Sequence, residues 1–326
     1  MTKLLLAVAF AATLAGISSA ASQVYPSRPI TMVVPFAAGA GQPDTIGRIV
    51  AERMRASLGQ AVIIENAAGA NGSLGVGRVA RAAPDGYTLV IGLRDTHVVN
   101  GAIYALPYDV LADFEPVALL SNSRGALLVA KKSLPANDLK GLIAWLKANP
   151  DKASQGHPGF GSLPHLSGIH FQNITGTRFQ FVPYRGSGPA MQDLLAGQID
   201  MMFVGADTAL PQVRASRINA YAITAMSRLV DAPDIPTVDE AGLPGFYSSQ
   251  WFAIFAPKGT PKNVVAKLNA AVVDALADPA VRQRFADIEN EIPPRDQLTP
   301  EALGALQKAD IEKWWPIIKA AGIKAE

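Results

Sequence analysis

The sequence of 326 residues contains no cysteine, which excludes disulfide bonds, thiolate metal sites and a cysteine nucleophile. It has only four histidines, and none of them is spaced from another as in the motif of zinc proteases. We therefore expect neither a metal nor a cofactor. Without covalent cross-links the chain depends on buried cores, and it is long enough for two domains of ordinary size.

An excess of charge of one sign is also missing. The 29 Lys and Arg residues nearly balance the 27 Asp and Glu residues, so the formal net charge is +2. Proteins that bind nucleic acids usually carry a strong basic excess on one surface. The sequence therefore gives no support for a nucleic-acid partner.

Long hydrophobic runs are absent except at the N-terminus. There Lys3 precedes an apolar run over residues 4–14, and the small residues 18–20 follow it. This run is too short to span a bilayer, which needs about 20 apolar residues. The pattern is typical of a secretory signal peptide over residues 1–20, with cleavage near Ala20, and it predicts an exported protein.

The remaining chain alternates between β-rich runs and amphipathic segments, which predicts parallel sheets covered by helices. We expect strands at residues 30–35, 61–65, 88–92, 153–155, 179–184, 199–204, 220–224 and 252–256. Residues 116–120 and 126–130 are predicted to form one long strand. Helices are expected at residues 43–58, 72–83, 138–148, 162–171, 187–196, 208–214 and 261–277, and the last third of the chain is helical.

A glycine-rich turn at residues 36–44 joins the first strand to the first helix. Backbone N–H groups and the positive end of a helix dipole meet at such a turn, which makes it suitable for an anion. One interpretation is a dinucleotide site, but Asp44 stands where that fingerprint has its third glycine. The simpler interpretation is a carboxylate site, in which Asp44 caps the helix and lies one turn before Arg48.

A second glycine-rich turn, at residues 159–166, again follows a predicted strand and opens a helix. Two helix N-termini that face each other suit a ligand with two anionic ends, or one end clamped from both sides. Two further candidate loops are residues 94–97 and residues 184–189.

Short sequence segments along nearly the whole chain resemble those of the tripartite tricarboxylate transporter substrate-binding proteins, the Bug-type periplasmic receptors. In chain order these segments are Tyr25-Pro26-Ser27-Arg28-Pro29-Ile30, Val34-Pro35-Phe36, Val62-Ile63-Ile64-Glu65-Asn66, Ala82-Ala83-Pro84-Asp85-Gly86-Tyr87-Thr88-Leu89, Leu106-Pro107-Tyr108-Asp109, Pro183-Tyr184-Arg185-Gly186, Ile235-Pro236-Thr237-Val238, Glu240-Ala241-Gly242-Leu243-Pro244-Gly245 and Ala256-Pro257-Lys258-Gly259-Thr260-Pro261.

The resemblance implies a type II periplasmic binding protein of the α/β class, with two α/β domains and a ligand cleft between them. It implies a discontinuous first domain, residues 21–123 and 249–326, and a second domain, residues 124–248. The chain would cross between them near residues 120–127 and return near residues 247–252. The implied location is the periplasm.

The resemblance also implies that a carboxylate is held by the loop after Phe36 and by the glycine-serine loop near Ser162, partly through ordered water. Candidate ligand-binding residues are Phe36, Ala38, Gly39, Gly41, Arg94, Thr96, His97, Phe160, Gly161, Ser162, His165, Tyr184, Arg185 and Asp207.

Several of these candidates have an alternative role. Arg94 is the first candidate to bind a distal carboxylate of the ligand; alternatively, it forms an ion pair with Asp95. Arg185 is the second candidate; alternatively, it is exposed. Phe36 lines the wall of the cleft or packs in the core, and Phe160 stacks on a ring of the ligand.

His97 and His165 contact the ligand or make capping bonds. Ser162 is an N-cap whose hydroxyl points into the cleft, and Asp207 holds a water or an amine, or caps the next helix.

The sequence departs from the family at three presumed ligand loops. The first is Ala37-Ala38-Gly39-Ala40-Gly41-Gln42-Pro43, which is poorer in glycine and proline than usual. The second is the pair Arg94-Asp95, where small polar residues are common. The third is Val204-Gly205-Ala206-Asp207, where Asp-Asn often follows the phenylalanine. Ligand specificity therefore cannot be transferred from the family.

The expected function is a periplasmic receptor, not an enzyme, that captures a small organic carboxylate by closure of the cleft. Di- and tricarboxylates are candidates, including an aromatic diacid such as terephthalate. The partners would be integral membrane transporter subunits, or a sensor ectodomain, and the receptor itself is expected to be a monomer. The alternative is an exported hydrolase or a nucleotide-binding enzyme of α/β fold, although the nucleophile elbow pattern is absent around Ser162.

Overall fold

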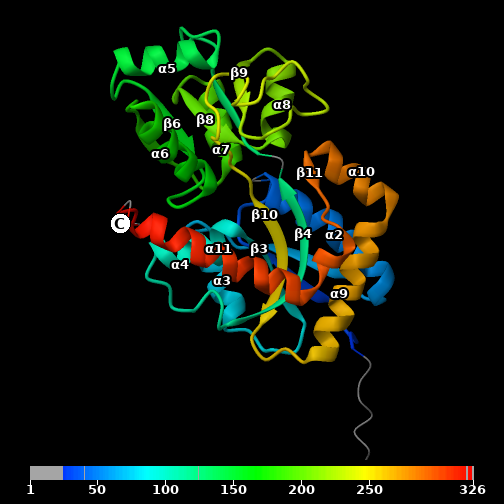
Figure 1. Cartoon of the computed structure of the whole chain (residues 1–326). Helices are drawn as coiled ribbons and strands as arrows, with labels where there is room; N and C mark the ends of the chain where they lie inside the picture. The colour runs from blue at the N-terminus through cyan, green and yellow to red at the C-terminus, as the bar shows by residue number, and fades with distance from the viewer. Residues whose placement is uncertain (1–24, 40, 124, 321, 325–326) are drawn as a thin grey trace, which may run out of the picture.

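The computed structural model describes residues 25–39, 41–123, 125–320 and 322–324. The predicted signal peptide lies outside these residues. The described residues form two lobes, each a mixed β-sheet flanked by helices, and one lobe lies above the other in the view of Figure 1. No helix among the described residues is both long and apolar enough to cross a membrane.

The first sheet combines strands from both ends of the chain, in the order β11-β4-β10-β3-β1-β2. The strands β1 (Ile30–Val34), β2 (Val62–Asn66) and β3 (Thr88–Leu93) are parallel. Strand β10 (Trp251–Pro257) runs antiparallel between β3 and β4 (Phe114–Ser123), and β11 (Asn290–Glu291) pairs with the far edge of β4. Apart from the edge strands β2 and β11, these strands are largely buried, as a sheet covered on both faces requires.

Helices cover both faces of this sheet. On one face α2 (Gln42–Leu58) and α9 (Lys262–Ala277) bury Ile46, Ile49 and Leu268 against Ile30 and Val34. On the other face α3 (Ser73–Ala80) and α11 (Pro300–Ala320) cover the alternate side chains of the strands. The shorter α4 (Asn100–Ile103), α10 (Pro279–Asp287) and the 3₁₀ turn η2 (Arg295–Leu298) complete this domain.

The second sheet has the order β7-β6-β8-β5-β9. Its strands are β5 (Leu127–Lys131), β6 (Ser154–His157), β7 (Gln180–Pro183), β8 (Met201–Val204) and β9 (Ile218–Ile223). The helices α5 (Leu139–Ala148) and α6 (Leu163–Thr175) cover one face, and α7 (Ser187–Leu195) and α8 (Ala206–Arg214) cover the other. The predicted alternation of strands and helices is confirmed, and the fold is that of a type II periplasmic binding protein.

The prediction of one long strand over residues 116–130 was wrong. Strand β4 ends at Ser123 and pairs in the first sheet, whereas β5 begins at Leu127 and pairs in the second. The apolar pattern continues because both segments are buried, but the hydrogen-bonding partners change where the chain crosses between the domains.

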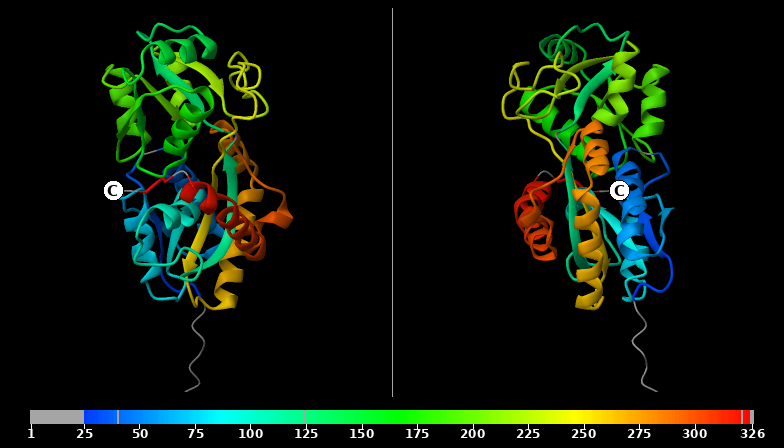
Figure 2. Two further views of the ribbon diagram at one scale, coloured as in Figure 1. Left: turned by 60° about the vertical axis from the view of Figure 1, so that its left-hand side comes forward. Right: turned by 90° about the vertical axis from the view of Figure 1, so that its right-hand side faces the viewer.

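The return crossing runs beside the first one. The backbone N–H of Ser123 donates to the carbonyl oxygen of Gln250 at 2.7 Å, and the N–H of Gln250 donates to Ser123 Oγ at 2.9 Å. The views of Figure 2 show the two lobes joined by these adjacent segments.

The prediction of a loop at residues 94–97 was also wrong. Directly after β3 the chain enters a π-helical turn, η1 (Asp95–Val99), which continues into α4. Arg94 already has helical backbone angles, φ −53° and ψ −40°. A helical turn sends successive side chains in different directions, so residues 94–97 do not share one environment.

Candidate functional site

The loops that follow the parallel strands of both sheets meet between the domains. In open α/β sheets, ligands bind beyond the carboxyl ends of the strands. Three cavities lie in this region. The inner cavity, of about 90 Å³, includes Phe36, Gly41, Gln42, Asp95, Leu163, Ser187, Asp207, Thr208 and Gln250 in its lining. The outer cavity, of about 150 Å³, is bordered by Phe36, Ala68, Gly69, Ala70, Asn71, Gly72, Tyr104, Pro158, Gly159, Phe160, Pro183, Tyr184 and Arg185.

The third, or back, cavity lies toward α11 and has a volume of about 280 Å³. Its apolar lining includes Leu166, Phe246 and Ile318. Phe36 and Pro158 belong to both the inner and the outer cavity, whereas Asp95 belongs to both the inner and the back cavity.

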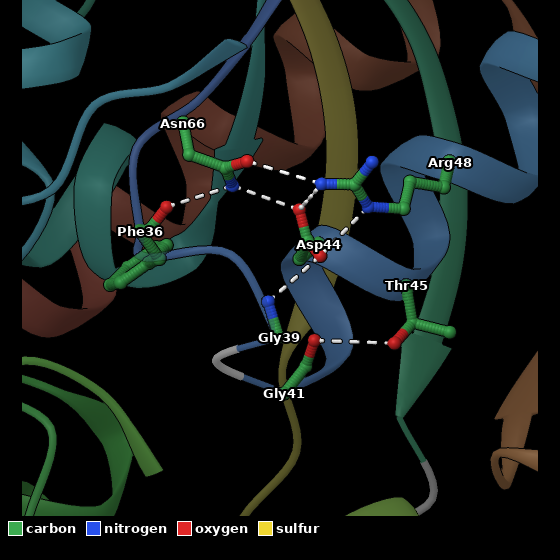
Figure 3. Close-up of polar contacts among 7 residues, drawn as sticks. All are labelled: Phe36, Gly39, Gly41, Asp44, Thr45, Arg48 and Asn66. Carbon is green, nitrogen blue, oxygen red and sulfur yellow. Dashed lines mark hydrogen bonds and ion pairs between the residues drawn. The ribbon is translucent and has the colours of Figure 1, made fainter. Parts of the chain in front are cut away.

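Asp44 holds the turn between β1 and α2 in place (Figure 3). Its Oδ2 accepts hydrogen bonds from Gly39 N at 3.0 Å and from Arg48 Nε at 2.9 Å. Its Oδ1 accepts from Asn66 Nδ2 at 2.8 Å. Burial raises the pKa of Asp44, but the hydrogen bonds from Arg48, Asn66 and Gly39 outweigh it and keep that pKa below its usual value. The pairing of Asp44 with Arg48 is confirmed, but Asp44 is not the helix cap: the N-cap of α2 is Gly41, and Asp44 ties down the loop before it through Gly39.

This turn places Gly41 at the N-terminus of α2, facing the second domain. A Cβ placed on Gly41 would lie 3.9 Å from Thr208 Oγ1 and 4.0 Å from Ser187 Cβ, and its φ of +90° favours glycine. Ala38 and Gly39 lie outside on an exposed stretch of the loop. Phe36 is 8% exposed, packs in the first core and also lines both cleft cavities, so its two expected roles coexist.

The second glycine-rich turn, ahead of α6, lies opposite. Ser162 is the N-cap of α6, and its Oγ accepts a hydrogen bond from the backbone N–H of His165 at 3.4 Å. Gly161 N donates to His165 Nδ1 at 3.1 Å. A Cβ on Gly161 would lie 2.7 Å from Ile103 Cδ1 of the first domain, so the two domains are in close contact here.

The imidazole rings near this turn are neutral. His165 is 5% exposed and packs 4.6 Å from His157, between centroids, within a cluster that also contains Phe160 and Phe181. Burial lowers the pKa of His165 to about 3 and that of His157 to about 4. Neither ring therefore offers a positive charge to an anionic ligand at neutral pH.

Two carboxylates line the inner cavity, that of the buried Asp95 and that of the half-buried Asp207. Asp95 is 5% exposed, and its Oδ2 accepts a hydrogen bond from the N–H of Leu163 at 3.0 Å, which links the first domain to the start of α6. Asp207 lies in the first turn of α8, whose N-cap is Gly205, and its carboxylate accepts hydrogen bonds from Thr208 and from its own N–H. Burial raises the pKa of each carboxylate to about 6.

Of the fourteen predicted site residues, only Phe36, Gly41 and Asp207 line the inner cavity. Arg94 borders the back cavity, where its guanidinium lies over the Trp314 ring at 5.2 Å. Thr96 and His97 are fully buried in the core of the first domain. Thr96 Oγ1 and His97 Nδ1 are 2.9 Å apart, and the His97 ring stacks on Phe255 at 4.1 Å.

In this conformation neither Thr96 nor His97 offers an atom to a ligand in the cleft. The physical reason is the helical turn at residues 95–99, which sends these side chains into the core.

The last three candidates border the outer cavity. Phe160 is 40% exposed and makes an edge contact with His157. The Tyr184 hydroxyl donates to Asp193 Oδ2 at 2.7 Å, so it is engaged within the second domain. Arg185 is exposed at the rim.

Comparison with known proteins agrees with this architecture. Residues 46–323 match the model of the tripartite tricarboxylate transporter family receptor. The chain belongs to this receptor family. Protein BugT of Bordetella pertussis is 35% identical over 327 residues, which cover 99% of each chain.

Two solved structures of periplasmic relatives are also similar. The periplasmic binding protein BugD is 38% identical with a TM-score of 0.86, covering 92% of this chain and 100% of its own. MatC of Rhodopseudomonas palustris, solved with bound malate, is 41% identical with a TM-score of 0.85, covering 90% and 100%. This family consists of solute-binding receptors rather than enzymes.

The receptor's inner cavity contains residues that the sequence did not single out. Gln42, Thr208 and Gln250 line it, and Asp95 was considered only as a neighbour of Arg94. Gln42 and Thr208 adjoin predicted glycine or acidic positions, so proximity to those loops was a usable signal. Gln250 lies in the return crossing, where no local pattern indicates a cavity.

Proposed function

We propose that this receptor captures a small organic carboxylate in the periplasm by closure of its two domains. We assign residues 21–123 and 249–326 to the first domain and residues 124–248 to the second. The observation that carries the proposal is the pair of strand–turn–helix junctions that meet at the inner cavity, one at Gly41 and the other directly after Ser162, where Leu163 and Pro164 line it. Each junction belongs to a different sheet, so a ligand between them contacts both domains.

The energy available at such a site is sufficient for a transport receptor. Micromolar affinity corresponds to about −8 kcal/mol. A hydrogen bond to a charged group contributes about 1.5–3 kcal/mol, and a helix N-terminus adds about 0.3–1 kcal/mol. Several backbone donors from the two turns therefore meet the requirement, even after the entropy cost of closure.

The family supports delivery to membrane subunits of a tripartite tricarboxylate-type transporter, and malate in MatC supports a carboxylate ligand. A sensor ectodomain is the other partner that we consider. The N-terminal Lys3 and the apolar residues 4–14 support export. We propose that the mature receptor is a monomer, because cleft closure needs only one chain.

A hydrolase is a poor fit to the contacts of Ser162. Its Oγ accepts from the backbone of His165, and the Nδ1 of that ring accepts from Gly161. The geometry required of a nucleophile and its base, a bond between the hydroxyl and the imidazole, is therefore not present among these contacts.

Thermal unfolding of the mature protein tests the proposal. A ligand that binds only the folded state stabilises it by RT ln(1 + [L]/Kd). We expect a concentration-dependent rise in Tm with at least one member of a panel of mono-, di- and tricarboxylates, with and without amino or hydroxyl groups. No shift with any of them, together with turnover of an ester substrate, would favour the hydrolase instead.

A further inference from the structure

The charges around the two cleft cavities are arranged by sign. The inner cavity is lined by the carboxylates Asp95 and Asp207, and no Lys, Arg or His belongs to its lining within the described chain. The outer cavity has the opposite composition, because Arg185 is its only ionisable group besides the tyrosines in the described residues. A small molecule that spans both cavities would therefore meet negative charge at its inner end and positive charge at its outer end.

Two of the helix N-termini at the inner cavity are already occupied by carboxylates of the protein itself. Asp95 accepts the first N–H of α6 from Leu163, and Asp207 accepts the N–H of Thr208 at the start of α8. These are the helix N-termini that a ligand carboxylate would otherwise use. A second anion placed beside Asp95 and Asp207 would also be repelled by both carboxylates.

Each carboxylate keeps one oxygen without a partner. Oδ1 of Asp95 and Oδ1 of Asp207 are shielded from solvent and meet no hydrogen-bond donor with good geometry among the described residues, although the Gln250 side chain lies close enough to the Asp95 carboxylate to lower its pKa. The Asp207 oxygen lies close over the backbone, because a Cβ on Gly205 would be only 2.6 Å from it. Buried acceptors of this kind are costly unless a donor reaches them.

The side chain of Gln250 supplies a third buried oxygen without a hydrogen-bond partner. Its side chain is 8% exposed, lines the inner cavity, and its Oε1 has no hydrogen-bond partner among the described residues. An ammonium group carries one positive charge and three donors, so it matches three unpartnered oxygens of which two belong to carboxylates. A carboxylate ligand group has no donor to give them.

The surroundings provide little competing positive charge inside the cleft. His157 and His165 are neutral, and Arg94 lies over Trp314 in the back cavity. Burial raises the pKa of Asp95 and of Asp207 to about 6, so both are mainly ionised at pH 7.5 and become fully so when a cation binds.

We propose that the ligand of this receptor carries a protonated amine as well as a carboxylate, with the amine held by Asp95, Asp207 and Gln250. The carboxylate lies at the N-terminus of α2, where Gly41 lines the inner cavity, and faces the outer cavity, which Arg185 borders. The inference rests on the proposed function, because it assigns the chemical class of the ligand at the same site.

Matched ligands test the amine directly. Succinate, malate and aspartate differ only in carrying hydrogen, hydroxyl or ammonium on one carbon; adipate and 2-aminoadipate, and pentanoate and 5-aminopentanoate, form two further sets. Binding is measured by thermal shift and calorimetry at pH 7.5. In at least one set we expect the aminated member to bind at least about tenfold more tightly than its partner, as one charge-assisted hydrogen bond allows.

A matched pair of variants locates the effect. Asp207→Asn keeps the size of the side chain and removes its charge, and we expect it to weaken the aminated ligand at least about tenfold while the unaminated partner binds as before or better. Asp234→Asn makes the same change on an exposed side chain of the same domain that has no partner among the described residues. It should leave both affinities unchanged.

The outcomes separate the inference from the proposed function. If unaminated carboxylates bind as well as their aminated partners, the amine is refuted while the carboxylate receptor stands. If putrescine binds and no carboxylate does, the amine site stands and the proposed function fails. If no compound in the sets binds at millimolar concentration, both are overturned. An equal loss for aminated and unaminated ligands in Asp207→Asn also contradicts the inference.

Discussion

The Asp95 carboxylate joins the two domains by accepting a hydrogen bond of 3.0 Å from the backbone N–H of Leu163. Leu163 is the first residue of α6, so a protein carboxylate occupies the positive end of that helix. A second bond across the cleft runs from the Tyr104 hydroxyl to the carbonyl oxygen of Phe160 at 2.8 Å. These two contacts favour the closed arrangement of the domains.

We expect Asp95→Ala to shift the ligand-free protein toward open conformations. The substitution removes the acceptor of the Leu163 bond and a buried charge, so the domains lose a link while the first domain keeps its core. Small-angle X-ray scattering should report a larger radius of gyration than for the wild type. Tyr104→Phe removes the other cross-domain bond and should act in the same direction; an unchanged radius in both variants would contradict a role in closure.

Stability should depend on pH through Asp207. Burial raises the pKa of Asp207 from 3.8 to about 6 in the folded protein. Between these pH values the folded state binds more protons than the unfolded state, so this group's contribution to stability falls as the pH rises from about 4 and is fully lost above about 7. Each pKa unit corresponds to about 1.4 kcal/mol, so the loss approaches about 3 kcal/mol.

The buried histidines act in the opposite direction. Their pKa values are lowered, so they reduce stability as the pH falls below about 6.5. The difference between Asp207→Asn and wild type isolates the carboxylate. Urea unfolding should show the variant more stable than wild type by about 1–3 kcal/mol at pH 7.5, with little difference at pH 4.5. The same difference at both pH values would show that the charge is not its cause.

Asp44→Ala should disorder the turn between β1 and α2. It leaves Gly39 N and Asn66 Nδ2 without their acceptor and removes the ion pair with Arg48. We expect a loss of about 2 kcal/mol in the free energy of unfolding, together with weaker ligand binding.

Glu52→Ala is the matched control, because Glu52 is a 73% exposed side chain on the same helix that pairs with Arg284. Its cost should stay below about 1 kcal/mol, and ligand affinity should not change. Equal effects of the two substitutions would show that the Asp44 network does not shape the site.

The two candidate arginines should behave differently. Arg185 lies exposed at the rim of the outer cavity, so Arg185→Gln should weaken carboxylate ligands several-fold, more at low ionic strength than at high. Arg94 borders the back cavity on Trp314, so Arg94→Gln should leave the ratio of dicarboxylate to matched monocarboxylate affinity unchanged. A selective loss of dicarboxylate binding in Arg94→Gln would place this guanidinium on the ligand after all.

Much of the fold could be predicted from short stretches of the sequence. The helix from Gln42 to Leu58 has its apolar residues on one face and a glycine directly after it, and both signals lie within a few turns of sequence. The second glycine-rich turn could be predicted in the same way, because Ser162 is an N-cap with Pro164 in the first helical turn. These features depend on neighbours in the chain, which a sequence displays directly.

Features that depend on distant partners were not predicted correctly. The strand over residues 116–130 looks continuous because both halves are apolar, but hydrogen bonds to β10 and to β8 assign the halves to different sheets. His97 looked like a polar loop residue. The π-helical turn that buries it against Phe255 has no pattern of its own in the sequence.

The sequence by itself determined the class of this protein, with two cysteine-free α/β cores and two glycine-rich helix starts suited to a charged ligand, and it predicted export. Only the tertiary structure decided which side chains meet between them. Asp95 and Asp207 are more than 100 positions apart, and both reach one cavity because two separate sheets place their strand ends face to face. The sign of the charge in that cavity follows from through-space proximity and burial, which the linear order of residues does not encode.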